Sequence, residues 1–379
     1  MTDVFIVSDN IITSLGFSTG ENASNMTAGI TGIRLISDES LSPDPFYVSL
    51  VDTDRLRGTF SQILDPEEFT RFEQMAILSI KAAVAATKID FSGERTLFIL
   101  STTKGNIDLL GKNTGKNDPG LYLWHTAKRL GDFFRFRINP LVISNACTSG
   151  LQAVITGSRL IRAGYYDNVV INGTDIISEF VVSGFSSFKS LSTGPCRPFD
   201  STRDGLSLGE GSGTIILTNN KGASKQTFRI RVGMGFSGND ANHISGPSRT
   251  GEGLFLVTDR VMKNSPSMPD FISAHGTGTL YNDEMEAIAL TRAGLQNIPV
   301  NSFKGYWGHT LGAAGVIELA MCVHSMNNNV LFPTKGFREP GLENKLNVID
   351  RVIKTEVNAC LKTASGFGGC NSALYLFKT

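Results

Sequence analysis

An apolar strand runs directly into a helical pattern in the stretch Val142-Ile143-Ser144-Asn145-Ala146-Cys147-Thr148-Ser149-Gly150-Leu151-Gln152-Ala153-Val154. Cys147 is therefore expected where a strand turns into the start of a helix. Because helix starts favour anions, this position predicts a lowered thiol pKa and a nucleophilic role. Gly150 predicts a close approach by another chain segment or a substrate. This window alone leaves open that Cys147 is a buried, small apolar residue.

The composition is that of a globular chain. It has 379 residues, 41% of them hydrophobic, with 35 basic and 35 acidic side chains. This length allows two core-forming halves, and the balanced charge gives no indication of nucleic acid or of an acidic membrane surface as a partner. The five cysteines show neither a Cys-x-x-Cys pair nor zinc-site spacing, so we expect a cytoplasmic location and no metal. We also expect neither a signal peptide nor a membrane span, because Lys81 interrupts the longest helical apolar stretch.

Strands and helices are expected to alternate along the chain. Asp65 predicts the N-cap of one long helix over residues 66–87, followed by a buried strand at 96–101. With a further strand at 168–173, this alternation predicts a largely parallel sheet. The glycine run at 209–213 precedes a strand and does not open a helix, which argues against a dinucleotide or phosphate loop.

Two polar stretches interrupt this pattern. Residues 103–119 are rich in glycine, asparagine and lysine and predict a mobile connection. Residues 219–226 lack an apolar pattern, so we place a domain boundary near Thr227. The predicted halves are residues 1–227 and 228–379.

Three stretches of the second half favour a catalytic role for Cys147. They are Ser273-Ala274-His275-Gly276-Thr277-Gly278-Thr279, Lys304-Gly305-Tyr306-Trp307-Gly308-His309-Thr310-Leu311-Gly312-Ala313-Ala314-Gly315 and Gly366-Phe367-Gly368-Gly369. Singly, a loop histidine is more often structural and a glycine loop is more often a tight turn. Together they suit carbon–carbon bond formation through a thioester. A thiolate would hold the acyl group, two imidazoles would stabilise an enolate, and backbone N–H groups would bind an oxyanion.

These motifs, in this order, resemble the β-ketoacyl-acyl carrier protein synthases of the thiolase superfamily, specifically their elongating Cys-His-His class. The likeness is close from about Val142 onward and loose before it. It implies an α/β, thiolase-like fold of two similar halves that form a five-layered α-β-α-β-α sandwich. The first half would carry the cysteine, and the second would carry both histidines and the glycine-rich gating loop. The implied reaction is a decarboxylative Claisen condensation with malonyl-acyl carrier protein in fatty acid or polyketide-like biosynthesis.

The resemblance also implies a role for each catalytic residue. Cys147 would accept the acyl chain, and His275 and His309 would donate hydrogen bonds to the malonyl thioester carbonyl. The N–H groups of Cys147 and Phe367 would form the oxyanion hole, and the Phe367 ring would gate the acyl pocket. Lys304 would order the site electrostatically; an ordinary buried ion pair is the alternative.

Supporting and substrate-binding residues follow from the same resemblance. Lys304 would pair with Glu318 and with the acidic turn of Asp283 and Glu286. The substrate-binding residues would be Thr277, Thr279, Phe367 and Gly368. The two threonines would hydrogen-bond the phosphopantetheine arm, although loop threonines more often cap local backbone. The enzyme would need no cofactor of its own, since the carrier protein brings the phosphopantetheine. Its partners would be the acyl carrier protein and, in a homodimer or heterodimer, a second ketosynthase-like subunit.

The sequence departs from this family in two places. The segment from Gly105 to Cys147 is short and contains an unusual run at 121–136, which leaves acyl length and dimer partner open. Residues 65–72 are acidic where many relatives present basic residues to the acidic carrier protein, and only Arg71 is basic there. Docking is therefore assigned to a set of basic residues elsewhere: Arg197, Arg203, Lys128 and Arg129.

Single residues distinguish the elongating class from other members of the superfamily. Initiating synthases carry asparagine in the place of His309, and chain-length factors lack the cysteine. A coenzyme A-dependent thiolase or acyltransferase would need a second cysteine acid, for which Cys370 is the candidate. A non-catalytic partner subunit that keeps the site residues by descent is the alternative from a different functional class.

Overall fold

The computed structural model describes residues 2–110, 118–224 and 230–379. The strands of its main sheet are β1 (Phe5–Ile12), β4 (Thr96–Ser101), β5 (Leu141–Ile143), β6 (Asn168–Asp175), β8 (Gly211–Thr218), β9 (Ile230–Asn239), β10 (Phe271–Ser273), β11 (Val300–Asn301), β14 (Ala359–Gly366) and β15 (Cys370–Lys378). Shorter strands are β2 (Arg34–Ile36), β3 (Phe46–Ser49), β7 (Leu208–Gly209), β12 (Val330–Leu331) and β13 (Ile353–Lys354). The helices are α1 (Thr19–Thr27), α2 (Thr53–Phe60), α3 (Arg71–Ala85), α4 (Leu123–Phe133), α5 (Ser149–Arg162), α6 (Glu179–Ser187), α7 (Glu252–Lys263), α8 (Leu280–Arg292), α9 (Lys304–Trp307) and α10 (Ala314–Asn328).

The main sheet consists of two halves that meet at its centre. Its order is β11-β10-β14-β15-β9-β1-β8-β6-β4-β5. Among the described residues, strands β1 and β9 join the halves through two residue pairs, Phe5 with Arg231 and Ile6 with Ile230. The chain therefore builds one half-sheet on each side of this seam.

The expectation of a largely parallel sheet is wrong. Strand β4 runs parallel to β5 and β6, and β10 runs parallel to β11 and β14. The other neighbours are antiparallel. The connection from β14 to β15 explains part of the difference, because residues 367–369 are too few for the crossover that parallel strands need.

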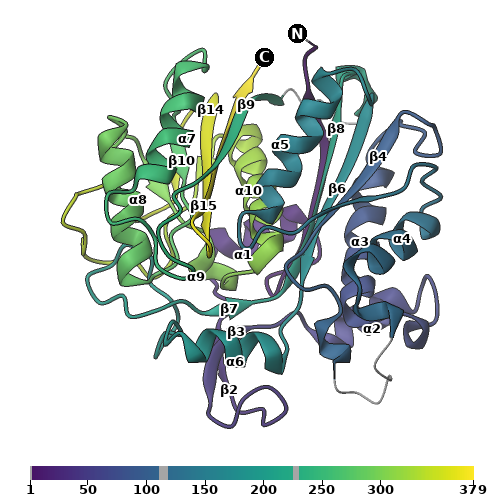
Figure 1. Cartoon of the computed structure of the whole chain (residues 1–379), viewed down its shortest axis with the longest axis horizontal. Helices are drawn as coiled ribbons and strands as arrows, with labels where there is room; N and C mark the ends of the chain where they lie inside the picture. Colours follow the sequence, from purple (N-terminus) through teal and green to yellow (C-terminus); the bar gives the residue numbers. More distant parts are fainter. Residues whose placement is uncertain (1, 111–117, 225–229) are drawn as a thin grey trace.

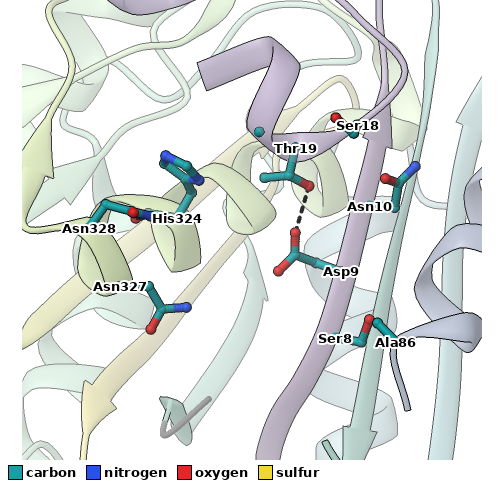
Figure 2. A pocket seen from close by; sticks show the side chains of 10 residues that line it. Ser8, Asp9, Asn10, Ser18, Thr19, Ala86, His324, Asn327 and Asn328 are labelled. Atoms are coloured by element: carbon teal, nitrogen blue, oxygen red, sulfur yellow. Dashed lines mark hydrogen bonds between the residues drawn. The ribbon is translucent and has the colours of Figure 1, made fainter. Parts of the chain in front are cut away.

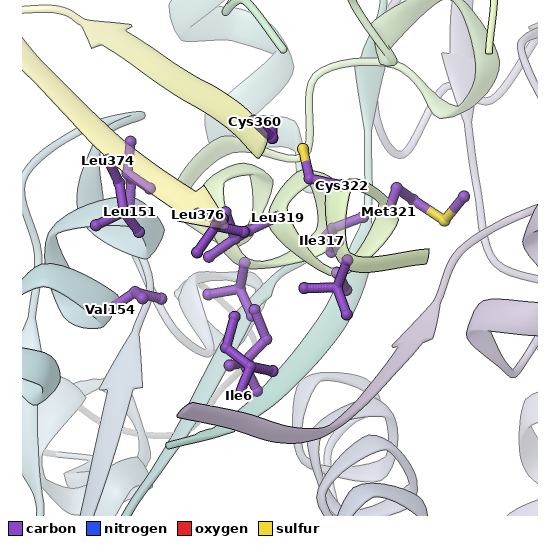
Figure 3. Packing of buried hydrophobic residues seen from close by; sticks show 14 of the residues in the cluster. Ile6, Leu151, Val154, Ile317, Leu319, Met321, Cys322, Cys360, Leu374 and Leu376 are labelled. Atoms are coloured by element: carbon purple, nitrogen blue, oxygen red, sulfur yellow. The ribbon is translucent and has the colours of Figure 1, made fainter. Parts of the chain in front are cut away.

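Helices cover the half-sheets on both faces and produce the five layers expected for a thiolase-like α-β-α-β-α sandwich (Figure 1). Helix α3 packs on β1 and β8, and α7 packs on β9 and β15, with α8 beside it. Helices α5 and α10 pack against each other between the two half-sheets. Figure 3 shows this central core, where Leu151 of α5 and Ile317 of α10 lie among residues of the strands. Burial of these side chains away from water provides most of the stabilisation of the layers.

The long helix predicted from residue 66 is wrong at its beginning. Asp65 caps only a short 3₁₀ turn, Pro66–Glu68. Helix α3 then starts after Thr70, whose side chain accepts a hydrogen bond from the Glu73 N–H while Glu73 accepts one from the Thr70 N–H. This capping box, Thr70-x-x-Glu73, is legible in the sequence and begins a new helix.

Two predictions about connections fall on positions outside the described residues. The domain boundary near Thr227 is one of them, so the division into 1–227 and 228–379 stays a prediction. Residues 111–117 of the connection at 103–119 are the other; its described ends contain the 3₁₀ turns Ile107–Leu109 and Pro119–Leu121. In the part of the chain that the structure describes, no helix is both long and apolar enough to cross a bilayer.

The close approach predicted at Gly150 is confirmed. A Cβ at this position would lie 2.8 Å from the Val316 nitrogen and 2.9 Å from the Gly312 oxygen. Both of these atoms belong to backbone and cannot be moved by a side-chain rotation. The start of α5 is therefore packed backbone to backbone against the start of α10.

We expect Gly150→Ala to lower the free energy of unfolding by about 1–3 kcal/mol, because a methyl group would overpack this contact. Gly184→Ala in α6 is the matched control, since among the described residues no other heavy atom lies within 4 Å of the position that its methyl group would take. That control should be neutral or stabilising by up to about 1 kcal/mol, because alanine favours a helix. Urea unfolding curves measure both values, and equal midpoints for the two variants would contradict the expectation.

Candidate active site

Three reactive side chains that the sequence singled out meet in the structure. Cys147 lies between β5 and α5, His275 follows β10, and His309 follows α9. The Cys147 sulfur and one ring nitrogen of each histidine all lie within 4.8 Å of one another. The imidazole centroids are 5.1 Å apart with the rings nearly perpendicular. All three side chains are buried, so this contact is shielded from bulk water.

Backbone conformation places these residues. Ala146 has a φ of 46° and Leu311 a φ of 52°, both in the left-handed region that non-glycine residues seldom adopt. The turn at Ala146 presents Cys147 next to Gly366, where a Cβ would lie 3.0 Å from the Cys147 nitrogen. The His309 N–H donates to the Ser207 carbonyl at 2.8 Å, which ties this loop to the first half. Such backbone strain is typical of functional sites, where the packing of the surrounding fold holds it in place.

Hydrogen bonds assign the ring protons of both histidines. The Leu311 N–H donates to His309 Nδ1 at 3.3 Å. The Lys304 ammonium, which can only donate, lies 3.3 Å from His275 Nδ1. With both Nδ1 atoms accepting, each neutral ring carries its proton on Nε2. His309 Nε2 is buried and without a hydrogen-bond partner among the described residues, so its proton is available to a substrate.

Both imidazoles are neutral in this environment. Burial lowers the pKa of His275 well below its ordinary value, and the nearby Lys304, His309 and Lys362 lower it further. Burial likewise lowers the pKa of His309, with Lys304 as the largest charged contributor. This assignment makes each ring a hydrogen-bond donor through Nε2, and the absence of a metal ion stays a prediction.

The expectation of a lowered thiol pKa at Cys147 is wrong for the free protein. Burial raises the pKa of this thiol to about 11, although Lys304, Lys104 and a hydrogen bond from the Phe367 N–H act in the opposite direction. Cys147 precedes the N-cap Thr148, so it stands just outside the first helical turn. Desolvation of the thiolate therefore outweighs the favourable field of the helix start.

Lys304 and Glu318 form the predicted pair, and the structure adds a second lysine. Lys304 Nζ lies 2.6 Å from Glu318 Oε1, and Lys362 Nζ lies 2.6 Å from Glu318 Oε2. Burial alone would raise the pKa of Glu318, but the two lysines outweigh it and lower that pKa. The sequence analysis missed Lys362; its only signal was a single lysine inside an apolar strand, β14.

Asp283 and Glu286 hold the histidine loop and form no ion pair with Lys304. Glu286 accepts from the N–H groups of His275 at 2.7 Å and Gly276 at 2.6 Å. Asp283 accepts from the Thr277 N–H at 2.9 Å. Burial raises the pKa of both carboxyl groups, to about 7 for Glu286. Backbone N–H groups thus occupy the oxygens of this acidic turn, and Lys304 acts on Glu286 only through its charge, which lowers the pKa of Glu286.

Asp175 is another buried residue that the sequence analysis missed. Its carboxylate accepts from the Thr103 N–H at 2.9 Å and from the Gly312 N–H at 2.7 Å. It also accepts from the Thr102 hydroxyl at 2.7 Å. These bonds connect the end of β4 with the loop that follows His309. Nothing in the sequence around Asp175 distinguishes it from an acidic residue at a strand end.

A cavity of about 410 Å³ opens onto the three reactive residues. Its lining includes the predicted substrate-binding residues Thr277, Thr279, Phe367 and Gly368. The two threonine hydroxyls lie 2.9 Å apart and bond to each other. The Phe367 ring stacks on Phe185 at a centroid distance of 5.6 Å and meets Phe188 edge-on at 5.2 Å. The cavity thus has a polar wall at the threonines and an aromatic wall at Phe367.

Cys370 lies apart from this arrangement. Its thiol donates to Asn145 Oδ1 at 2.9 Å, and the residue does not line the cavity among the described positions. A second cavity of about 430 Å³, shown in Figure 2, shares no lining residue with the first. There Asp9 accepts from the Thr19 hydroxyl at 2.6 Å, and burial raises its pKa to about 6. Neither feature adds a group to the site.

The basic residues assigned to carrier docking are engaged within the chain. Arg203 is buried against Glu284, which removes it as a surface contact. The other three have carboxylate partners: Arg197 with Asp204, Lys128 with Asp132 and Arg129 with Glu73. Arg71, the basic residue of the acidic segment, pairs with Glu210. Intrachain pairing therefore reduces the charge that each of them offers to a partner.

Known proteins resemble this chain over most of its length. The β-ketoacyl synthase N-terminal domain matches residues 1–223, and the β-ketoacyl synthase C-terminal domain matches residues 230–338. The 3-oxoacyl-[acyl-carrier-protein] synthase 2 of Rhizobium meliloti is 34% identical over 62% of this chain and 59% of its own length. The tetracenomycin polyketide synthase ketoacyl synthase alpha subunit of Streptomyces glaucescens is 31% identical over 93% of this chain and 91% of its own.

A solved structure is similar to this chain over its whole length. The ketosynthase from Xenorhabdus doucetiae, in complex with its chain length factor, superposes with a TM-score of 0.85 at 25% identity, over 100% of this chain and 98% of that one. The fold and the Cys-His-His cluster thus define a condensing acyltransferase. The chain belongs to the β-ketoacyl synthase family, which confirms the resemblance drawn from its motifs.

We expect iodoacetamide to alkylate Cys147 at a rate that rises about tenfold per pH unit between about pH 7.5 and 9.5, because only the thiolate reacts. The raised pKa of about 11 places this whole range below the midpoint of its titration. Peptide mass mapping over time measures the rate, and Cys147→Ser identifies labelling at other cysteines. A rate that levels off below about pH 8.5 would show that the thiol is more acidic than its burial dictates.

Proposed function

We propose that this protein extends carrier-bound acyl chains by a two-step condensation in which Cys147 holds the acyl group. In the first step the Cys147 sulfur attacks the thioester carbon of an acyl carrier protein. The bond to the phosphopantetheine sulfur breaks, and the thiol proton of Cys147 passes to that departing sulfur. The raised thiol pKa fits this order of events, since the incoming thioester is the group that receives the proton.

In the second step a malonyl thioester takes the place of the departed carrier. Loss of carbon dioxide leaves an enolate whose oxygen accepts hydrogen bonds from the Nε2–H groups of His275 and His309. The enolate carbon attacks the acyl carbonyl on Cys147, and the N–H groups of Cys147 and Phe367 stabilise the resulting oxyanion. Collapse of this intermediate breaks the carbon–sulfur bond and leaves a thiolate that takes a proton from solvent.

One observation carries the proposal: beside the buried sulfur, Nδ1 of each imidazole meets a hydrogen-bond donor, which leaves Nε2–H of a neutral ring as the donor to substrate. A charged imidazolium would bind the malonyl carboxylate and so oppose its loss, whereas a neutral donor favours the enolate oxygen. Thr277 and Thr279 in the cavity wall would bind the phosphopantetheine arm. We propose no cofactor beyond that arm, and a cytoplasmic location is supported by five cysteines that are all free thiols.

His309→Gln should separate the two steps. We expect Cys147 to be acylated by an acyl carrier thioester at a rate within about threefold of wild type, while carbon dioxide release from malonyl carrier protein falls by about 10²- to 10³-fold. Intact mass measures the first step and labelled carbon dioxide the second. His324→Gln is the matched control, because His324 lies on α10 away from this cavity. Equal losses in both steps, or none, would contradict the assigned role.

We propose that the carrier protein docks at the mouth of the cavity through apolar contacts. Phe188, Leu280 and Tyr281 line the cavity and are exposed large hydrophobic residues. An apolar docking surface is supported by the intrachain ion pairs of the basic residues that the sequence assigned to docking. We further propose a homodimer or a heterodimer with a ketosynthase-like subunit, supported by the similarity to a ketosynthase that pairs with a chain length factor.

Leu280→Asp should raise the KM for the acyl carrier protein about tenfold and leave kcat nearly unchanged, because it removes an apolar contact and repels an acidic partner. The matched control is Leu256→Asp, an equally exposed leucine on α7. Steady-state kinetics with varied carrier concentration measure the split. The docking assignment fails if both leucine variants show the same KM.

A further inference from the structure

Lys362 is a second buried cation at the core of the site. Its side chain and that of Lys304 are both 0% exposed, and the two ammonium groups share the Glu318 carboxylate from opposite oxygens. Lys362 comes from β14, Lys304 from α9 and Glu318 from α10, so three separate elements contribute to one ion cluster. Two lysines against one glutamate leave this cluster with one formal positive charge.

The remaining contacts of Lys362 point to the loop that carries His275. Its ammonium donates to the carbonyls of Ser273 and Ala274, both at 3.2 Å, and to the Thr363 carbonyl at 2.8 Å. Ser273 ends β10, and Ala274 immediately precedes His275. Lys304 binds the same loop one residue further on, at the His275 carbonyl, 2.6 Å away. The two lysines thus bind the carbonyls of three consecutive residues that end at His275.

The surplus positive charge acts on both imidazoles, and Lys304 Nζ lies 3.3 Å from His275 Nδ1. Other ionisable groups nearby are Glu286 and Asp283 on α8, which bind the loop backbone, and Lys104 and Asp175 on the Cys147 side. Glu318 can cancel only one of the two lysine charges. A positive field in a buried site disfavours a proton on a neighbouring imidazole and favours negative charge on a bound carboxylate or enolate.

We propose that Lys362 is a positioning residue for His275 in the decarboxylation step: it fixes the loop after β10 and, by sharing Glu318, preserves a net positive charge beside neutral imidazoles. This inference rests on the proposed function for its catalytic consequence. The lowered pKa of both histidines agrees with it, since the charge of Lys362 contributes to each, after burial and Lys304.

The variant Lys362→Met removes the charge and retains much of the side-chain volume. Glu318 keeps Lys304 as a partner, so no uncompensated carboxylate is left in the core. Lys362→Arg restores the charge, and Lys354→Met, at an exposed lysine in β13, is the matched control. Thermal unfolding of each variant reports whether the fold is retained.

The first readout is independent of activity. Ring signals of ¹³C-histidine-labelled protein, with the His275 signal assigned by a His275→Gln variant, give the pKa of each imidazole. We expect Lys362→Met to raise the pKa of His275, because a nearby positive charge is lost, while Lys362→Arg and Lys354→Met leave it close to wild type. An unchanged His275 pKa in Lys362→Met overturns the inference whatever the activity.

The second readout is the pH dependence of each step. Lys362→Met should release carbon dioxide from malonyl carrier protein at least about tenfold more slowly while acylating Cys147 within about threefold of wild type. Its acid limb should lie at higher pH, since a histidine with a higher pKa loses its neutral form sooner as pH falls. Equal losses in both steps with an unshifted acid limb would mean a structural role only. Failure of the wild-type protein itself to release carbon dioxide would refute the proposed function, and the histidine titration would still decide the case for Lys362.

Discussion

The contact between the backbones of α5 and α10 is the constraint on which the site depends. Gly150 and Gly315 remove the side chains that would separate these helices, and a Cβ at Gly315 would lie 2.2 Å from the Leu151 nitrogen. The cysteine lies just before α5, and His309 lies before the 3₁₀ turn Leu311–Ala313 that leads into α10. A larger separation of the two helix starts would therefore move the sulfur away from the imidazole. The packing of the central layer is at once a stability requirement and the geometry of the active site.

Burial then sets the chemistry within that geometry. The same desolvation that raises the pKa of the Cys147 thiol lowers the pKa of both histidines, so all three groups are uncharged before substrate arrives. Fixed charge is supplied instead by Lys304, Glu318 and Lys362, which compensate one another in part. The groups that react are therefore neutral, and the permanent charges belong to the lysines and the glutamate that surround them. Negative charge develops in the site only when a substrate supplies a thioester carbonyl and a carboxylate.

The sequence was most informative where local chemistry determines structure. The strand-to-helix turn at Cys147 and the glycine-flanked His275 and His309 were predictable because the motifs themselves dictate the backbone. The pKa of Cys147 was not predictable, since it depends on how many distant segments exclude water from the sulfur. Lys362 was missed because a lone lysine in a strand has no pattern, and its counter-charge lies 44 positions away in sequence, at Glu318 (362 minus 318). The wrong helix start at residue 66 had a different cause, since the capping box at Thr70 was visible but not weighed.

The strand order has a consequence for how the site comes into being. Strand β1 lies at the middle of the sheet and β15 lies between β14 and β9, so the earliest and the latest strands in sequence both sit near the centre. Pairing of such distant segments is slow to nucleate, because long loops must close first. The turn with Phe367 connects β14 to β15, and it takes its place over Cys147 only when β15 has inserted. During synthesis, the thiol pocket is therefore complete only after β15 has been made and has inserted between β14 and β9, and a chain that still lacks β15 presents no competent site to thioesters.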